Sequence, residues 1–476
     1  MAFRRFSGLK IDDLSIYKLK MPHLKIGDVV ATIPIVQGGM GVGISLSGLA
    51  SAVAKEGGIG VIAANAIGML EPDYYSDGIA ANKRALRAEI RKARELSTGI
   101  LGVNVMVALN DFHDLLQVVI EEKVDIVFLG AGLPLKGIPL AGLKAANVKV
   151  VPIVSSGRAA NLIFKYWQKN YGDIPDGVVV EGPRAGGHLG FKESQIGDPI
   201  FALEMLIPEV VEEIRPFEVL YNRSIPVIAA GGIFNGQDIY KFIKLGASGV
   251  QMATRFVATD ECDADKNFKD SYVNCKEEDI VIIKSPVGLP GRAIKNSFLR
   301  EVDAGMRKKF RCAWKCLEHC DAERTQYCIS QALNNARLGK LAHGFTFAGA
   351  NAYRIENIVS VKSLMLELKN DYSMMVSKET VVLRSEFEAA FKNLILLKDE
   401  YLKTAQKSVR SLKLEVEEIL EKGNVAFHEE YNRVLAKLDM LKVEYGKHLD
   451  RVTELKEQLS RYFDTSSMKL PTGTIS

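Results

Sequence analysis

The sequence predicts an α/β protein, a TIM-like (β/α)8 barrel followed by a C-terminal α-helical hairpin. Three observations support this fold class: eight short apolar runs that alternate with helical stretches, glycine-rich segments directly after several of these runs, and a C-terminal part almost free of glycine and proline. Residues 381–476 hold three of the 40 glycines and one of the 15 prolines. Glycine is needed mainly where a chain turns tightly or approaches another group closely, so the two parts make different backbone demands.

The eight predicted strands are almost continuously apolar, as parallel strands buried on both faces usually are. Eight strand–helix alternations within about 220 residues match a (β/α)8 barrel better than a doubly wound sheet, which more often stops at five or six strands. The strands are predicted at residues 33–37, 59–63, 101–105, 126–129, 149–154, 177–180, 227–230 and 249–252.

Glycine-rich segments follow the first, sixth and seventh predicted strands, and the loops after the strands carry the active site in such barrels. Residues 38–43 read GGMGVG, residues 181–190 read EGPRAGGHLG, and residues 231–232 are both glycine. Backbone N–H groups at glycine can approach a ligand closely, and a site after strands seven and eight commonly holds phosphate. The pattern favours a phosphate-bearing cofactor. The dinucleotide-binding fingerprint is excluded, because Ile44 stands where its third glycine is required.

His188 is the candidate catalytic residue among the seven histidines. It follows two glycines in the loop after the sixth predicted strand. Imidazole titrates near neutral pH, so it can take a proton from a carbon acid or give one to a developing anion. The alternative is a loop histidine bonded to the backbone, and position alone leaves both interpretations open.

Four of the six cysteines form one run: Cys312, Cys316, Cys320 and Cys328. Converging thiolates could hold a structural zinc ion or an iron–sulfur cluster. The spacing matches neither the paired zinc pattern nor the common ferredoxin run, so buried thiols that act as small apolar residues are the alternative. Six cysteines without a secretion signal in residues 1–14 indicate a reducing, cytoplasmic setting.

Charge and hydropathy exclude two classes of partner. The net charge is only +4, and residues 381–476 balance 16 basic against 16 acidic side chains, so no nucleic-acid partner is expected. Residues 36–54 carry no charge but include five glycines and three serines, so no membrane span is expected. A small-molecule substrate is the remaining expectation.

The C-terminal part reads as two long helices. The first is predicted over Ser385–Glu421 and ends at a turn over residues 422–424. In the second, apolar residues from Tyr431 to Tyr462 follow the three–four spacing of a heptad seam, which predicts an antiparallel, coiled-coil-like hairpin. The hairpin is expected to pack on the barrel or on another subunit, which gives a homo-oligomer. The predicted domains are 1–260 (barrel), 261–380 (cysteine-containing cap and barrel-closing segment) and 381–476 (hairpin).

Four motifs in order resemble the nitronate monooxygenase family, formerly called 2-nitropropane dioxygenase and related to the FMN-dependent enoyl-ACP reductase II. They are Pro34–Gly43, Val180–Gly190, Pro226–Ile233 and Gly246–Thr259. The resemblance covers most of residues 20–370, including Gly344–Tyr353. It implies an FMN-binding TIM-like barrel, with His188 at the position of the family's catalytic histidine.

The resemblance also implies a cofactor site. The first glycine-rich loop and Asn104 would contact the isoalloxazine, the sixth loop would line the site, and the last two loops would hold the phosphate. The implied cofactor-binding residues are Gln37, Gly38, Gly39, Met40, Asn104, Glu181, Gly187, Gly231, Gly232, Gln251, Ala253 and Thr254.

Two activities are consistent with this resemblance. The first is oxidation of alkyl nitronates with oxygen by an FMN-dependent nitronate monooxygenase. The second is NAD(P)H-dependent reduction of enoyl thioesters, because Asp279–Asn296 is similar to the reductase branch. A flavin-binding assembly scaffold without turnover is a third hypothesis, ranked below both because His188 is present.

Overall fold

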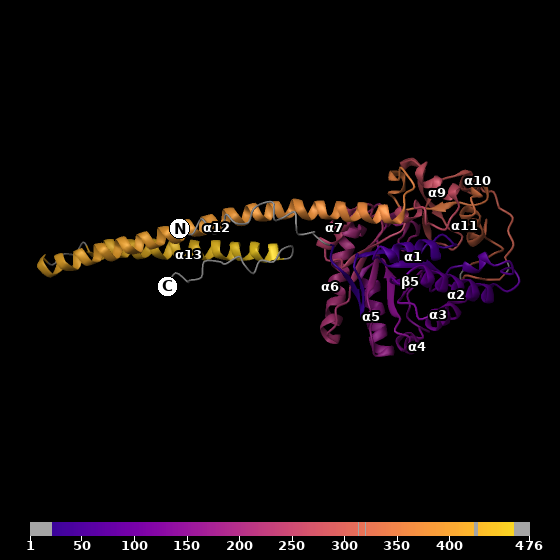
Figure 1. Ribbon diagram of the computed structural model, residues 1–476, viewed down its shortest axis with the longest axis horizontal. Helices are drawn as coiled ribbons and strands as arrows, with labels where there is room; N and C mark the ends of the chain where they lie inside the picture. The colour runs from indigo at the N-terminus through magenta and orange to yellow at the C-terminus, as the bar shows by residue number, and fades with distance from the viewer. Residues whose placement is uncertain (1–20, 313, 319, 423–426, 461–476) are drawn as a thin grey trace. The chain divides into compact units, whose positions relative to one another are not determined.

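The computed structural model describes residues 21–312, 314–318, 320–422 and 427–460. The chain divides into two compact units, one over residues 21–372 and one that starts at Ser373 (Figure 1). The expectation of no secretion signal in residues 1–14, the predicted turn at Gly423-Asn424 and the seam residue Tyr462 lie outside the described residues.

Eight parallel strands form the main sheet of the first unit, in the order β3-β11-β10-β8-β7-β6-β5-β4. Each overlaps one predicted strand, and their ends differ from the prediction by at most two residues. They are β3 (Ile35–Gln37), β4 (Gly60–Ala63), β5 (Leu101–Met106), β6 (Ile126–Gly130), β7 (Lys149–Val154), β8 (Val178–Glu181), β10 (Val227–Ala230) and β11 (Gly249–Met252).

Backbone hydrogen bonds between the first and last strands of this order close the sheet. The N–H of Gln37 donates to the carbonyl of Ile59 at 2.9 Å, and the N–H of Ile59 donates to the carbonyl of Ile35 at 2.9 Å. The predicted TIM-like (β/α)8 barrel is therefore confirmed. Its strands are apolar on both faces because side chains fill the interior and helices cover the outside.

A helix follows each strand of the barrel, and Figure 1 shows α2 to α6 around it in chain order. Side-chain caps define where several of these helices begin. Ser156 accepts the N–H of Ala159, and Asn235 and Asp238 form a capping box. The helices are α1 (Ser47–Lys55), α2 (Gly78–Leu96), α3 (Phe112–Glu121), α4 (Leu140–Ala145), α5 (Gly157–Tyr171), α6 (Leu203–Tyr221), α7 (Gly236–Lys244) and α8 (Thr254–Val257).

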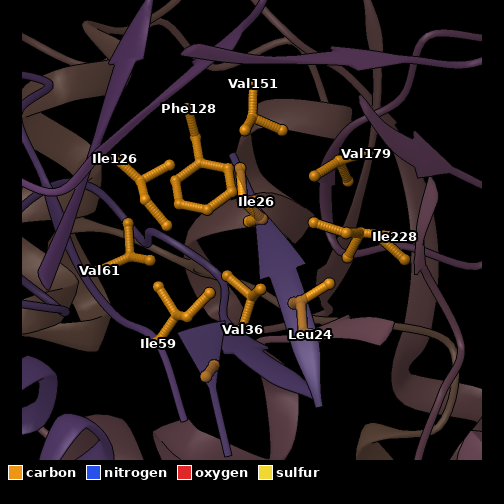
Figure 2. Packing of buried hydrophobic residues seen from close by; sticks show 12 residues of the cluster. Leu24, Ile26, Val36, Ile59, Val61, Ile126, Phe128, Val151, Val179 and Ile228 are labelled. Atoms are coloured by element: carbon orange, nitrogen blue, oxygen red, sulfur yellow. The ribbon is translucent and has the colours of Figure 1, made fainter. Parts of the chain in front are cut away.

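A short antiparallel hairpin, β1 (Leu24–Ile26) with β2 (Val29–Ala31), plugs one end of the barrel. Figure 2 shows Leu24 and Ile26 among inward-facing side chains of the barrel strands, and both are fully buried. A Cβ on Gly249, the first residue of β11, would lie 3.1 Å from Leu24. The plug therefore closes the end where strands begin, and the opposite end, where strands finish, is left for the site.

A small cap follows the barrel and packs on the loop after β8. Its strands are β12 (Ile280–Lys284), β13 (Pro290–Ile294) and β14 (Thr346–Phe347), with helices α9 (Lys266–Val273), α10 (Ser297–Asp303) and α11 (Ile329–Arg337). Strand β9 (Gly187–His188), which belongs to the barrel loop, pairs antiparallel with β13. The cap and the barrel thus share one sheet at this point.

Two long helices, α12 (Val361–Lys422) and α13 (Phe427–Ser460), account for the C-terminal prediction. The prediction that the first helix begins at Ser385 was wrong, because α12 begins 24 residues earlier. The physical reason is that no glycine or proline interrupts residues 361–422, so nothing in the sequence stops the helix. None of the described helices is both long and apolar enough to cross a membrane.

The two helices of the second unit run antiparallel. Arg451 pairs with Glu386 and Lys437 pairs with Glu400, so residue numbers rise along one helix as they fall along the other. A cluster of Leu383, Phe387, Leu394, Tyr445, Val452 and Leu455 is buried between them, and its three members from α13 belong to the predicted seam. The predicted helical hairpin is confirmed.

Leu394→Ala tests this seam, and Leu396→Ala is its matched control. Leu394 is fully buried, whereas Leu396 is 57% exposed two residues later on the same helix. We expect Leu394→Ala to destabilise the hairpin by roughly 2–4 kcal/mol because it leaves a cavity, and the control to change stability by less than about 0.5 kcal/mol. Hydrogen exchange of amides in residues 383–397 and 441–455 measures both. Equal exchange in the two variants would contradict the seam.

Candidate active site

A cavity of about 60 Å³ lies where strands β8, β10 and β11 end. Six of the twelve predicted cofactor residues line it, which brings together three loops far apart in sequence. Its lining consists of Glu181, Ala185, Gly186, Ala230, Gly231, Gly232, Ile233, Phe234, Gln251, Met252, Ala253, Thr254, Gly349 and Asn351. The other six predicted residues lie outside this lining.

Gly231 and Gly232 both need to be glycine. Their φ angles are +97° and +85°, a left-handed region that side chains rarely adopt. A Cβ on Gly231 would also lie 2.8 Å from the carbonyl oxygen of Gly182. No described residue accepts a hydrogen bond from the N–H groups of Gly231, Gly232 or Ile233. Buried N–H groups are rarely left unpaired, so this row of donors suits an anionic ligand.

The loop around Gly349 completes the cavity from the cap side, and sequence reasoning assigned it no role. The hydroxyl of Thr254 accepts the N–H of Gly349 at 3.0 Å, which leaves the hydroxyl hydrogen free to be donated. Asn351 donates to the carbonyl of Gly232 at 2.5 Å and accepts from Arg184 at 2.8 Å. The only available signal was the motif Gly344–Tyr353, which the resemblance included without a function.

The loop after β3 adjoins the same end of the barrel. A Cβ on Gly38 would lie 3.4 Å from the side chains of Gln251 and Ala253, and a Cβ on Gly39 would lie 2.5 Å from the Cβ of Asn104. The strand ends thus approach one another without intervening side chains, and Gly38 reaches the lining of the cavity. Met40 is half-buried in this loop, and its N–H donates to Ser45 at 2.8 Å.

Gln37 has a structural role that the sequence did not reveal. It is fully buried, its Oε1 accepts the N–H of Val61 at 2.9 Å, and its Nε2 donates to the carbonyl of Gly38 at 2.5 Å. The side chain therefore joins the end of β3 to the beginning of β4. Its assignment to the cofactor stays a prediction.

His188 is held in place from two sides. Its backbone belongs to β9, where His188 is paired with Gly291 of β13, and its Nε2 lies 2.6 Å from the hydroxyl of Ser285. The ring packs edge-on against Phe347 with centroids 5.0 Å apart. Burial lowers the pKa of His188 to about 4, because it disfavours the charged imidazolium. At neutral pH the imidazole is uncharged and can accept a proton.

Gly187 and Arg292 fix the loop that carries His188. Gly187 has φ +85° and is paired with Arg292 in the β9–β13 ladder. The guanidinium of Arg292 donates to the carbonyls of Pro183 and Ala185, at 2.6 and 2.7 Å, and burial lowers its pKa to about 10. Sequence reasoning missed Arg292, because no motif or spacing in the neighbouring sequence indicates its role.

Glu181 is the acidic group of the cavity. It ends β8, and no described residue forms a hydrogen bond with its carboxyl group. Burial raises the pKa of Glu181 to about 7, so the group is close to half protonated at neutral pH. A neutral carboxyl can donate as well as accept a hydrogen bond.

A larger cavity of about 260 Å³ adjoins the first and shares Gly231, Gly232 and Asn351 with it. Three basic side chains line it, Arg184, Lys241 and Arg354, together with three acidic ones, Asp198, Glu204 and Asp238. Lys241 is paired with Glu204, so its charge is offset within the cavity wall. Arg184 bonds the neutral amide of Asn351, and the charged side chains of the lining balance one another in number.

All six cysteines are free thiols. Cys312, Cys316, Cys320 and Cys328 influence one another's pKa through charge, so the four thiols lie within electrostatic reach of each other. Among the residues that the structure describes, no three His, Cys, Asp or Glu side chains are placed to hold a metal ion. His319, within the same run, is outside the described residues. The metal site therefore stays a prediction.

Comparison with known proteins places this geometry in context. The family model described as "Nitronate monooxygenase" matches residues 24–371. A "Probable nitronate monooxygenase" from Staphylococcus aureus (strain Newman) is 30% identical over 305 residues, covering 56% of this chain and 77% of that protein. The protein of the same description from strain MSSA476 is 28% identical with the same coverage.

Two solved structures are similar to this chain. FabK from Thermotoga maritima is 29% identical with a TM-score of 0.58, covering 73% of this chain and 94% of FabK. A nitroalkane oxidase from Streptomyces ansochromogenes is 23% identical with a TM-score of 0.56, covering 73% of this chain and 97% of that protein. At this identity, the second likeness supports the fold alone.

Glu181→Gln tests the environment of the cavity. A carboxyl whose pKa is raised on folding takes up a proton, so its cost to stability grows as pH rises from about 4.5 through 7. We expect Glu181→Gln to match the wild type at pH 5 and to be more stable by roughly 1–3 kcal/mol at pH 8. Urea unfolding of the flavin-free protein at both pH values measures this.

Glu193→Gln is the control for this substitution, because Glu193 is exposed. It should show the same stability relative to wild type at both pH values. A pH-independent difference for Glu181→Gln would contradict a buried, unpaired carboxyl at the end of β8.

Proposed function

Because the chain belongs to the nitronate monooxygenase family and is an oxidoreductase of that family, we propose that it oxidises alkyl nitronates with molecular oxygen, using FMN. The observation that carries this proposal is the fixed position of His188, whose Nε2 lies 2.6 Å from the hydroxyl of Ser285 and whose backbone pairs with β13. It lies two residues from Gly186, which lines a cavity rich in unpaired N–H donors. A base beside an anion-binding cavity suits chemistry on an acidic carbon.

The cavity residues fit the phosphate end of FMN. The free N–H groups of Gly231 and Gly232 and the hydroxyl hydrogen of Thr254 would donate to phosphate oxygens. Gly38, Gly39 and Asn104 would adjoin the isoalloxazine, where bare backbone allows close approach. FMN supplies the capacity to accept electrons from the substrate and pass them to oxygen.

Residues of this chain would accept the proton that a neutral substrate loses. A nitronate needs no deprotonation, whereas a neutral nitroalkane must first lose its α-proton. The uncharged ring of His188 can accept that proton at neutral pH, and the resulting imidazolium keeps its contact with Ser285.

A second candidate is NAD(P)H-dependent reduction of enoyl thioesters, with His188 as proton donor. A specific observation favours it: residues 279–296, which resemble the reductase branch, form β12 and β13 and bring Ser285 to His188. The likeness to FabK, which covers 94% of that protein, is consistent with it. An uncharged imidazole at neutral pH is better suited to accept a proton than to donate one, so we place this candidate second.

One assay separates the candidates. Anaerobic, FMN-loaded protein is mixed separately with propionate 3-nitronate and with NADH or NADPH, and flavin absorbance is followed. We expect bleaching by the nitronate and little by NAD(P)H. Rapid bleaching by NAD(P)H alone would favour the reductase, and bound flavin without any turnover would favour an assembly scaffold.

His188→Ala completes this test. Loss of general base catalysis typically costs a factor of about 10²–10⁴. We therefore expect that loss for neutral nitroalkane, with FMN retained and the preformed nitronate affected much less. An unchanged rate on the neutral substrate would remove His188 from catalysis.

The cysteine run carries a separate proposal, a structural zinc ion or iron–sulfur cluster held by Cys312, Cys316, Cys320 and Cys328. We expect stoichiometric zinc or iron in protein purified with and without oxygen, and its loss in Cys320→Ser. Cys262→Ser is the control, since Cys262 is buried elsewhere and bonds the carbonyl of Ile44. Only trace metal in wild-type protein would exclude the site.

We also propose a homo-oligomer assembled through the hairpin in a reducing, cytoplasmic setting. Exposed apolar side chains on both helices support the first point, among them Val381 (63%), Val382 (55%) and Val443 (58%). The six free thiols support the second point.

A further inference from the structure

We propose that Ser285 is a positioning residue for His188: its hydroxyl accepts the Nε2 hydrogen and so keeps the lone pair of Nδ1 available to the substrate. This inference rests on the proposed function, because the direction of the bond between His188 and Ser285 follows from the need for a lone pair on Nδ1. Neither the family comparison nor the implied cofactor site assigns a role to Ser285.

The β12–β13 turn holds Ser285 rigidly. Ser285 is only 6% exposed, its N–H donates to the carbonyl of Leu289 at 3.1 Å, and its carbonyl accepts the N–H of Gly288 at 2.9 Å. Gly288 has φ +82° with open space around it, which lets the chain reverse here. The hydroxyl therefore stands on a closed turn at the end of a strand.

The β12–β13 turn positions both the backbone and the ring of His188. After the turn, β13 pairs with β9, so that Gly291 is opposite His188, and Leu189 donates its N–H to the carbonyl of Pro290 at 2.8 Å. Strand β13, which follows the turn, thus fixes the backbone of His188. Ser285, which precedes the turn, contacts Nε2 of the ring at 2.6 Å. His188 and Ser285 are 97 residues apart in sequence, and the pairing of β9 with β13 brings them together.

The ring nitrogens have different surroundings. Nε2 contacts the hydroxyl of Ser285, whereas no described residue bonds Nδ1. An uncharged imidazole has one donor and one acceptor nitrogen. If Nδ1 is to take a proton from a substrate, it must be the acceptor, so Nε2 carries the hydrogen and Ser285 accepts it. Phe347, packed edge-on at 5.0 Å, opposes rotation of the ring.

This bond also stabilises the ring after proton transfer. The imidazolium carries hydrogen on both nitrogens, and Ser285 continues to accept from Nε2 as the ring becomes charged. Bonds from charged donors are stronger than neutral ones, so the contact strengthens as the reaction proceeds. Alanine at 285 removes the acceptor and frees both tautomers.

The test compares wild type, Ser285→Ala and Ser285→Thr as full-length, flavin-loaded proteins with isotope-labelled histidine rings. Nitrogen chemical shifts report which ring nitrogen bears hydrogen, and His188→Gln identifies the signal. We expect the Nε2–H form in wild type and in Ser285→Thr, and a mixture of tautomers in Ser285→Ala. An Nδ1–H form in wild type, or an unchanged ring in Ser285→Ala, would overturn the proposal.

Kinetics supply a second readout. Loss of one hydrogen bond to a group that becomes charged in the reaction costs a factor of roughly 10–100 in rate. We expect kcat on a neutral nitroalkane to fall by that factor in Ser285→Ala, with KM and the rate on preformed nitronate nearly unchanged and Ser285→Thr restored. Equal losses on both substrates would overturn a role in proton transfer.

Two controls keep the outcomes separate. Ser271→Ala removes a hydroxyl that donates to the carbonyl of Phe268 in α9, and it should change neither readout. If wild-type protein shows no nitroalkane turnover, the proposed function fails, whereas the tautomer measurement still decides the role of Ser285.

Discussion

The pairing of β9 with β13 is the contact on which the site depends. Gly187 is opposite Arg292, and His188 is opposite Gly291. Part of a barrel loop therefore forms a strand in the sheet of the cap. Through this one ladder the cap fixes the backbone of His188, and the buried guanidinium of Arg292 ties down the preceding residues of the loop. Without the ladder, the imidazole would sit on a glycine-rich loop with no fixed direction.

The two ends of the barrel differ: one is filled by apolar side chains, and the other carries the candidate site. The β1–β2 hairpin fills the end where strands begin with Leu24 and Ile26, inside an apolar cluster (Figure 2). The opposite end keeps small residues and unpaired backbone donors at Gly231 and Gly232. Such donors cost free energy when unpaired, so an anionic ligand would satisfy what the fold leaves open.

Sequence reasoning reached the fold and part of the site for physical reasons. Buried parallel strands leave a local mark, and so do glycines at their ends, which is why the eight strands and the glycine-rich edge of the cavity could be predicted. Ser285 and Asn351 could not, because they reach His188 and Arg184 across 97 and 167 residues. Gln37 has a structural role that its position at a strand end did not indicate, because its amide bonds the backbone of Gly38 and Val61. The start of α12 at Val361 was missed because no glycine or proline separates residues 361–384 from the predicted helix.

The central claim is that bare backbone at the ends of β10 and β11 holds the phosphate of a flavin. The most direct measurement compares the retention of FMN and of riboflavin, which lacks the phosphate, after incubation and desalting. About one FMN should remain per chain, and riboflavin should bind roughly 10–100-fold more weakly, since charge-assisted hydrogen bonds to the phosphate are lost. A protein that stays colourless with FMN, or that retains both flavins equally, would contradict the account.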